Sequence, residues 1–258
     1  MTTPAPHRII FANEKGGTGK STCAVHFAVA LASQGWRVAG IDLDPRQRTF
    51  HRYLENRQNT AKRREIELPT PRFEVFTGST IEELDDQVAR LSEGADYFVA
   101  DTPGRDDVFA RHLATTADTL VTPINDSFID FDLIGQVDPE TFQVTRPSFY
   151  SELIWDTRKA RAKSDGRTID WIILRNRLQH VDAHNMRRVG FRVIPGLGER
   201  VIYRELFPAG LTLLDKAHLG GMGIGHVVAR QELREAMGGL NLPARERLHP
   251  DGDLFAAA

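Results

Sequence analysis

A glycine-rich segment limits what this chain can fold into more than any other stretch: Glu14-Lys15-Gly16-Gly17-Thr18-Gly19-Lys20-Ser21-Thr22. An apolar run, residues 9–12, precedes it, and a helical pattern, residues 23–32, follows it, so the expected order is strand, loop, helix. The glycines leave room for backbone N–H groups to approach a phosphate chain at the positive end of a helix. The segment therefore predicts a phosphate-binding loop.

The side chains of this segment suit a nucleotide. Lys20 is expected to reach the β- and γ-phosphates, and the hydroxyl of Ser21 is expected to ligate Mg²⁺. The residues predicted to surround the phosphates are Gly16, Gly17, Thr18, Gly19, Lys20, Ser21 and Thr22. The alternative is a glycine-rich turn with solvated lysines, which the agreement of strand, loop spacing, lysines and hydroxyl disfavours.

Composition excludes several classes of protein. A formal net charge of −2 over 258 residues gives no overall attraction to nucleic acid or anionic membranes, so such binding would need a local patch. One cysteine, Cys23, excludes an intramolecular disulfide framework and a cysteine-built zinc site, and its expected role is packing against the sheet. No long apolar run and no signal-peptide core are found, so we expect a cytoplasmic protein.

Apolar runs and helical patterns alternate along the chain. Strands are expected at residues 9–12, 36–42, 73–76, 97–100, 119–124, 170–177 and 191–195, and helices at 23–32, 49–58, 81–91 and 148–163. The charge run 62–67 is expected to be solvated surface. This alternation predicts an α/β fold: a single-domain P-loop NTPase with a mostly parallel, twisted sheet and helices on both faces. We expect this domain to span residues 1–240, followed by a flexible tail, 241–258.

Carboxylates follow two of the expected strands. Asp42 is predicted to position the attacking water, and Asp101 to lie near Mg²⁺ outside its direct ligands. The turn after Asp101 contains Gly104, whose peptide N–H is expected to sense the γ-phosphate. Asp44 has two interpretations, a catalytic carboxylate or a residue that shapes the turn before Pro45.

Polar residues at the end of the expected strand 170–177 have a possible role at the base. The amide of Asn176, with Arg177 beside it, can pair with the adenine edge, and Pro195 is expected to pack on the other side of the base. The alternative for Asn176 is a cap at the end of the strand.

Arginines collect late in the chain, at Arg187, Arg188, Arg200 and Arg204. Arg200 and Arg204 share one face of an expected helix, which suits phosphate contacts with DNA and equally suits ion pairs with Glu199 or Glu205. If the patch binds DNA, affinity should fall steeply with salt and show little sequence preference.

The segment from Lys15 to Ser21 resembles the deviant Walker A loop of the ParA/MinD family. Further segments resemble the MipZ group of that family; they are residues 11–22, 42–50, 101–107, 125–135, 175–178 and 199–205. The resemblance implies a Mg²⁺-dependent ATP hydrolase, slow and coupled to dimerisation, in which ATP is held between two subunits and Lys15 of each contacts the nucleotide of the other. It also favours the adenine role of Asn176.

The resemblance further implies partners. These are the centromere-binding protein ParB, nonspecific DNA and FtsZ, whose assembly the dimer would inhibit, and the expected location is the nucleoid and the cell poles. A membrane anchor is not expected, because Pro243 and Pro250 interrupt any amphipathic C-terminal helix.

Some alternatives stay open. One departure from the family is the segment 181–189, which is too short for the helix that normally precedes the last strand. A chromosome-partitioning ParA ATPase, a metabolic P-loop ATP-dependent ligase and a scaffold that binds ATP without hydrolysing it are the competing functions. Turnover stimulated by a small molecule would indicate the ligase, and nucleotide-dependent dimers without phosphate release would indicate the scaffold.

Overall fold

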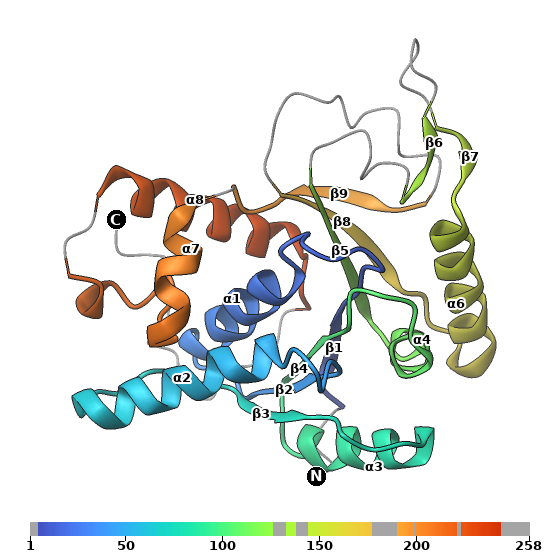
Figure 1. Ribbon diagram of the computed structural model, residues 1–258. Helices are drawn as coiled ribbons and strands as arrows, with labels where there is room; N and C mark the ends of the chain where they lie inside the picture. The colour runs from blue at the N-terminus through green and yellow to red at the C-terminus, as the bar shows by residue number, and fades with distance from the viewer. Residues whose placement is uncertain are drawn as a thin grey trace.

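A computed structural model of the chain describes residues 5–125, 133–137, 144–176, 190–198, 200–220 and 223–243. Its centre is a seven-stranded sheet in the order β3-β2-β4-β1-β5-β8-β9, in which every neighbouring pair is parallel (Figure 1). The strands are β1 His7–Phe11, β2 Val38–Asp42, β3 Arg72–Val75, β4 Tyr97–Asp101, β5 Thr119–Asn125, β8 Asp170–Asn176 and β9 Arg192–Pro195.

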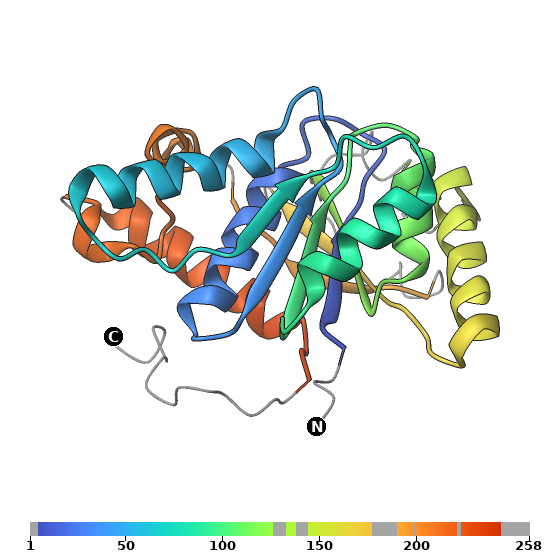
Figure 2. The same ribbon diagram turned by 90° about the horizontal axis from the view of Figure 1, so that it is seen from below.

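Helices cover both faces of this sheet, which Figure 2 shows as a layer between two sets of helices. One face packs against α1 Lys20–Ser33, α2 Thr49–Arg64 and α8 Ile224–Gly239. The other packs against α3 Ile81–Ser92, α4 Val108–Thr115 and α6 Phe149–Asp165. Because both faces are buried, the central strands are continuous apolar runs rather than alternating ones.

The first strand lies in the middle of the sheet, between β4 and β5. The chain fills the side of β2, β3 and β4 first and then crosses to β5, β8 and β9. In open parallel sheets, ligands bind beyond the carboxyl ends of the strands at such a crossing point. The glycine-rich loop leaves β1 at this place.

The helix α1 is apolar on nearly all sides, and its residues from Cys23 to Leu31 are all buried. A helix with this composition must lie in the core rather than on the surface. Its left-handed N-cap, Gly19 at φ 81°, belongs to the glycine-rich loop. Burial of α1 therefore fixes the loop to the centre of the sheet.

Smaller elements complete the described part of the chain. They are the antiparallel hairpin β6 Gly135–Val137 and β7 Val144–Pro147, the short helix α7 Val201–Leu206, and the 3₁₀ turns η2 Phe207–Ala209 and η3 Lys216–His218. No helix in the described ranges has both the length and the apolar composition to cross a bilayer.

The predicted fold class and each predicted strand are confirmed, with boundaries shifted by one or two residues. Several elements differ from the prediction or were missed. The helix predicted at 49–58 continues to Arg64 into the charge run, and α4, α8 and the β6–β7 hairpin were not predicted. The short segment 181–189 and the tail from residue 244 onward lie outside the described residues.

Candidate functional site

The glycine-rich loop connects the end of β1 to the start of α1. Gly17 and Gly19 have φ values of 78° and 81°, a left-handed conformation that strains any residue with a Cβ. The buried side chain of Asn13 shapes the entrance of the loop, since its Oδ1 accepts a hydrogen bond from Lys15 N at 2.7 Å and its Nδ2 donates to Pro123 O. The loop conformation is thus set by both glycines and by an amide contact with β5.

Lys20 and Asp101 meet at the floor of the site. Lys20 Nζ lies 2.8 Å from Asp101 Oδ1 and also donates to the backbone carbonyl of Thr102. Both side chains are buried, at 8% and 3% exposure. This contact joins the first residue of α1 to the end of β4.

A cavity of about 450 Å³ opens above this pair. Its lining comprises Lys15, Gly16, Gly17, Thr18, Gly19, Lys20, Ser21, Thr22, Asp44, Gln47, Thr49, Asp101, Thr102, Gly104 and Arg105. Every residue that the sequence placed around the phosphates is among them. Thr18 Oγ1 is buried without a hydrogen-bond partner in the described part of the chain, so a polar group of a ligand can still satisfy it.

Magnesium fits the same cavity. The Ser21 hydroxyl and the carboxylates of Asp44 and Asp101 border it, and oxygen donors of this kind are those that Mg²⁺ prefers. Among the described residues, no group of three or more Asp, Glu, His or Cys side chains is arranged to hold a metal ion.

The turn after Asp101 lies against the glycine-rich loop. A Cβ added to Gly104 would come within 3.2 Å of Gly16 Cα and 3.3 Å of Gly16 N, so only glycine allows this approach without displacing the loop. The next residue, Arg105, borders the cavity, and its Nη1 lies 3.6 Å from Asp44 Oδ2. Two post-strand loops and the glycine-rich loop therefore meet at one end of the cavity.

Asp42 is fully buried and does not line the cavity. Its Oδ1 accepts a hydrogen bond from Asp44 N at 2.9 Å, and its Oδ2 accepts one from His51 N at 3.1 Å. Burial, followed by the charge of Asp101, raises the pKa of Asp42 to about 6 against these hydrogen bonds. In this conformation Asp42 holds the loop between β2 and α2, and on that loop Asp44 lines the cavity.

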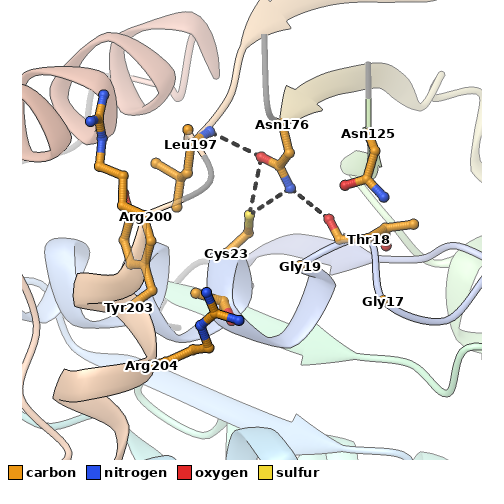
Figure 3. A pocket seen from close by; sticks show the side chains of 12 residues that line it. Gly17, Thr18, Gly19, Cys23, Asn125, Asn176, Leu197, Arg200, Tyr203 and Arg204 are labelled. Carbon is orange, nitrogen blue, oxygen red and sulfur yellow. Dashed lines mark hydrogen bonds between the residues drawn. The ribbon is translucent and has the colours of Figure 1, made fainter. Parts of the chain in front are cut away.

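A second cavity, of about 140 Å³, adjoins the first and shares Gly17, Thr18, Gly19 and Thr22 with it. Asn176 lies at its wall and bridges two segments (Figure 3). Its Nδ2 donates to Thr18 O at 2.7 Å, and its Oδ1 accepts from Leu197 N at 2.9 Å. Asn176 therefore ties the end of β8 to the glycine-rich loop, and its amide is already hydrogen-bonded within the protein.

Cys23 and two other side chains also line this second cavity. The thiol of Cys23 lies 3.6 Å from Asn176 Nδ2, and burial raises its pKa to about 12, so it is an inert packing group as predicted. Asn125 Oδ1 and the Tyr203 hydroxyl are buried without hydrogen-bond partners in the described part of the chain. Both are suited to contact a polar ligand.

Four further residues were predicted to contact the base or DNA: Arg177, Pro195, Arg187 and Arg188. Pro195 is exposed and does not line the second cavity; Leu197 and Gly198, a few residues later, do. Arg177, Arg187 and Arg188 lie outside the described residues.

Arg200 and Arg204 both border the second cavity, across it from Asn125 (Figure 3). Arg200 forms an ion pair with Glu232 of α8, which raises the pKa of the arginine. Arg204 is exposed. Arg200 therefore forms an ion pair with a partner on α8 that the sequence did not indicate, and the interpretation of both arginines as DNA contacts stays a prediction.

Several residues of the site were missed by sequence reasoning. Gln47, Thr49, Arg105, Leu197, Gly198 and Tyr203 line the cavities, and Asn13 supports the loop. Arg105 and Asn13 directly flank recognised motifs and could have been found by that adjacency. The contribution of the segment around Leu197 depends on long-range packing.

The chain is similar to a known protein family and to individual known proteins. The model of the family described as ATPase MipZ matches residues 7–244. The protein virC1 of Rhizobium radiobacter is 30% identical over 125 residues, 48% of this chain, and the chain spans about half, 51%, of that relative's length.

Two solved structures have the same fold. The MinD cell division protein of Aquifex aeolicus superposes with a TM-score of 0.61 at 17% identity, over 93% of this chain and 100% of the other. The septum site-determining protein MinD of Pyrococcus horikoshii OT3, complexed with Mg-ADP, gives 0.59 at 16% identity, over 88% and 94%. At these identities the structural likeness establishes the fold, whereas the family model covers nearly the whole sequence, so the chain belongs to the ATPase MipZ family.

Proposed function

We propose that the protein binds ATP with Mg²⁺ and hydrolyses it slowly, in a cycle between a monomer and an ATP-bound dimer. The observation that carries this proposal is the cavity between the glycine-rich loop, the Lys20–Asp101 pair and the turn at Gly104. Positive charge, backbone N–H groups and oxygen donors for a metal converge there, which is what phosphoryl transfer requires. Membership of the ATPase MipZ family supports the same chemistry.

Each part of the cavity has a role in this proposal. Lys20 and the backbone of Gly16, Gly17 and Gly19 bind the phosphates, while Ser21 holds Mg²⁺ with Asp101 behind it. Bound Mg²⁺ would neutralise charge that develops on the phosphate oxygens. Asp42 positions the attacking water, directly or through the loop that it holds. The second cavity binds the base and the ribose beside Asn176 and Leu197.

We further propose that ATP joins two copies of the chain. Lys15 borders the phosphate cavity next to the exposed Gly16 and Gly17, at the open side of the site. A lysine at that place can reach the nucleotide of a facing subunit. Dimerisation would then depend on the terminal phosphate.

The proposed biological role is spatial regulation of cell division. In this proposal the monomer is recruited by ParB, and the dimer binds nonspecific DNA and inhibits FtsZ assembly. Family membership is the support for these partners. For DNA, the exposed Arg204 is the described arginine best placed to contribute, since Arg200 is held by Glu232.

The decisive experiment is gel filtration of wild type and Lys15→Ala with ATP, with ADP and with a nonhydrolysable ATP analogue, accompanied by a phosphate-release assay. We expect wild type to elute as a dimer with ATP and the analogue and as a monomer with ADP, and Lys15→Ala to stay monomeric. Dimers that depend on neither the nucleotide nor Lys15 would refute the cycle. The absence of phosphate release would refute the enzymatic part.

A further inference from the structure

The two cavities give the nucleotide a direction. They meet at Gly17–Gly19, and from there the smaller one extends to Cys23 and Asn176, while the larger one extends to Gly16, Gly104 and Arg105. A nucleotide whose base occupies the smaller cavity must therefore place its outermost phosphate at the end where Gly104 contacts Gly16. Arg105 is the first side chain beyond that contact.

The guanidinium of Arg105 is loosely held in the structure. Its Nη1 lies 3.6 Å from Asp44 Oδ2 and its Nη2 lies 3.9 Å from Asp107 Oδ2, both beyond hydrogen-bond distance, and the side chain is 46% exposed. Long, exposed ion pairs of this kind contribute little to stability. The N–H donors of Arg105 are thus available to a better acceptor within the cavity.

A phosphate group is such an acceptor. Guanidinium and phosphate form two parallel, charge-assisted hydrogen bonds, which are shorter and stronger than neutral ones. Lys20, which is buried at the floor of the cavity, is already bound to Asp101 and to the Thr102 carbonyl. An incoming terminal phosphate therefore finds one loosely held arginine at its end of the site.

We propose that Arg105 contacts the terminal phosphate of ATP and makes the site prefer ATP over ADP. This inference rests on the proposed nucleotide binding and adds an arginine, supplied by the same chain, to the terminal-phosphate end. Positive charge at that position also stabilises the charge on the transferred phosphoryl group. Binding of the terminal phosphate would separate Arg105 from Asp44, because the same guanidinium pairs with either the phosphate or the carboxylate.

Calorimetric titration with a nonhydrolysable ATP analogue and with ADP tests the proposal. Arg105→Gln should weaken binding of the analogue by about 10-fold or more, the usual effect of losing a charged hydrogen bond, and leave ADP binding within about 2-fold. Arg105→Lys should restore part of the difference. Arg90→Gln is the matched control, because Arg90 is an exposed arginine that is paired with Glu74 and lines neither cavity, and it should change neither affinity.

The alternative is that Arg105 acts only by fixing Asp44. In that case Arg105→Gln would weaken binding of the analogue and of ADP alike, because Asp44 borders the cavity whichever nucleotide occupies it, whereas our proposal expects a loss for the analogue alone. Equal losses for both nucleotides in Arg105→Gln, or no loss, overturn the proposal while the proposed function stands. If wild type binds neither nucleotide, both fail.

Discussion

At the scale of single residues, Asp42 has the most unusual environment in the candidate site. Its carboxylate is fully buried beside Asp101, and in the described part of the chain it accepts hydrogen bonds from the backbone N–H groups of Asp44 and His51 and interacts with the charge of Lys20. Burial and the neighbouring carboxylate favour the neutral form, and they raise the pKa from its ordinary 3.8 to about 6. Protonation of Asp42 is therefore coupled to folding.

This coupling predicts how stability depends on pH. Between about pH 4 and pH 6 the folded state binds more protons at Asp42 than the unfolded state does, so the contribution of Asp42 to stability falls as pH rises through this window. Urea unfolding measures this effect. We expect the unfolding free energy of wild type, relative to that of Asp42→Asn, to fall by up to about 3 kcal/mol between pH 4 and pH 7. A constant difference over this range would show that Asp42 stays ionised in the fold.

A second prediction at this scale concerns hydrolysis. We expect Asp42→Ala to lower the rate of phosphate release by about 100-fold, a typical effect of losing a group that handles the attacking water, while ATP affinity changes little. Asp44→Ala is the matched comparison, because Asp44 follows on the same loop and lines the cavity. Unchanged turnover in Asp42→Ala would remove Asp42 from the mechanism, and equal losses in both variants would assign the effect to the shape of the loop.

At the scale of elements, the site depends on contacts between segments that are distant in sequence. Asn176 at the end of β8 donates to Thr18 O in the glycine-rich loop and accepts from Leu197 N after β9. All three groups are buried or nearly so. The position of the glycine-rich loop is therefore determined partly by a residue that follows it by 158 positions in the chain.

We predict that Asn176→Ala destabilises the protein by about 2 kcal/mol or more, because it leaves a buried donor and a buried acceptor without partners. Asn176→Asp should cost more, since a carboxylate oxygen would replace the Nδ2 donor at 2.7 Å from Thr18 O. Denaturant unfolding with and without ADP measures both effects. Asn125→Ala, which removes an amide whose Oδ1 has no partner among the described residues, is the control, and equal effects at both sites would contradict the prediction.

The elements of the fold differ in how well the sequence could predict them. The glycine-rich loop, the parallel strands and the positions of Lys20 and Asp101 follow from local patterns, because buried strands and phosphate loops have characteristic compositions. The last turns of α2 are charged and exposed, so they lack the apolar period that marks a helix, although basic residues there suit the negative end of its dipole. The helix α4 is only eight residues long, and its N-cap, Asp107, is the last residue of the segment 101–107 that resembles the family.

Long-range pairings could not be predicted at all. The cap interpretation of Asn176 and its adenine role were both open, and the structure adds a third, a bridge to the glycine-rich loop, that needs β8, β9 and α1 in place. Likewise, the ion-pair interpretation of Arg200 named Glu199 or Glu205 of its own segment, yet its carboxylate partner comes from α8. Such contacts depend on which elements become neighbours, which periodicity does not specify.

At the scale of the whole molecule, the C-terminal segments are held to the helical layer of α2 by a buried ion pair. Arg57 donates from Nη1 and Nη2 to the two oxygens of Asp215, at 2.7 and 2.8 Å, and also to the carbonyls of Pro69 and Gly210. Burial favours a neutral carboxyl at Asp215, but the hydrogen bonds and charge of Arg57 hold its pKa below the ordinary value. The Tyr53 hydroxyl adds a contact to Leu211 O nearby.

This pair predicts strongly non-additive mutations. Arg57→Met and Asp215→Asn should each lower the unfolding free energy by about 3–5 kcal/mol, because each leaves one buried group without its partner, and the double variant should lose well under the sum. The exposed pair Arg37–Asp96 provides the control cycle, with a coupling expected below about 1 kcal/mol. Nucleotide affinity should be unchanged in variants that remain folded, because neither Arg57 nor Asp215 borders the cavities. Additive losses at Arg57 and Asp215 would mean that the C-terminal segments are held to α2 by their apolar contacts, Leu206, Leu211 and Leu213 with Leu68, rather than by the ion pair.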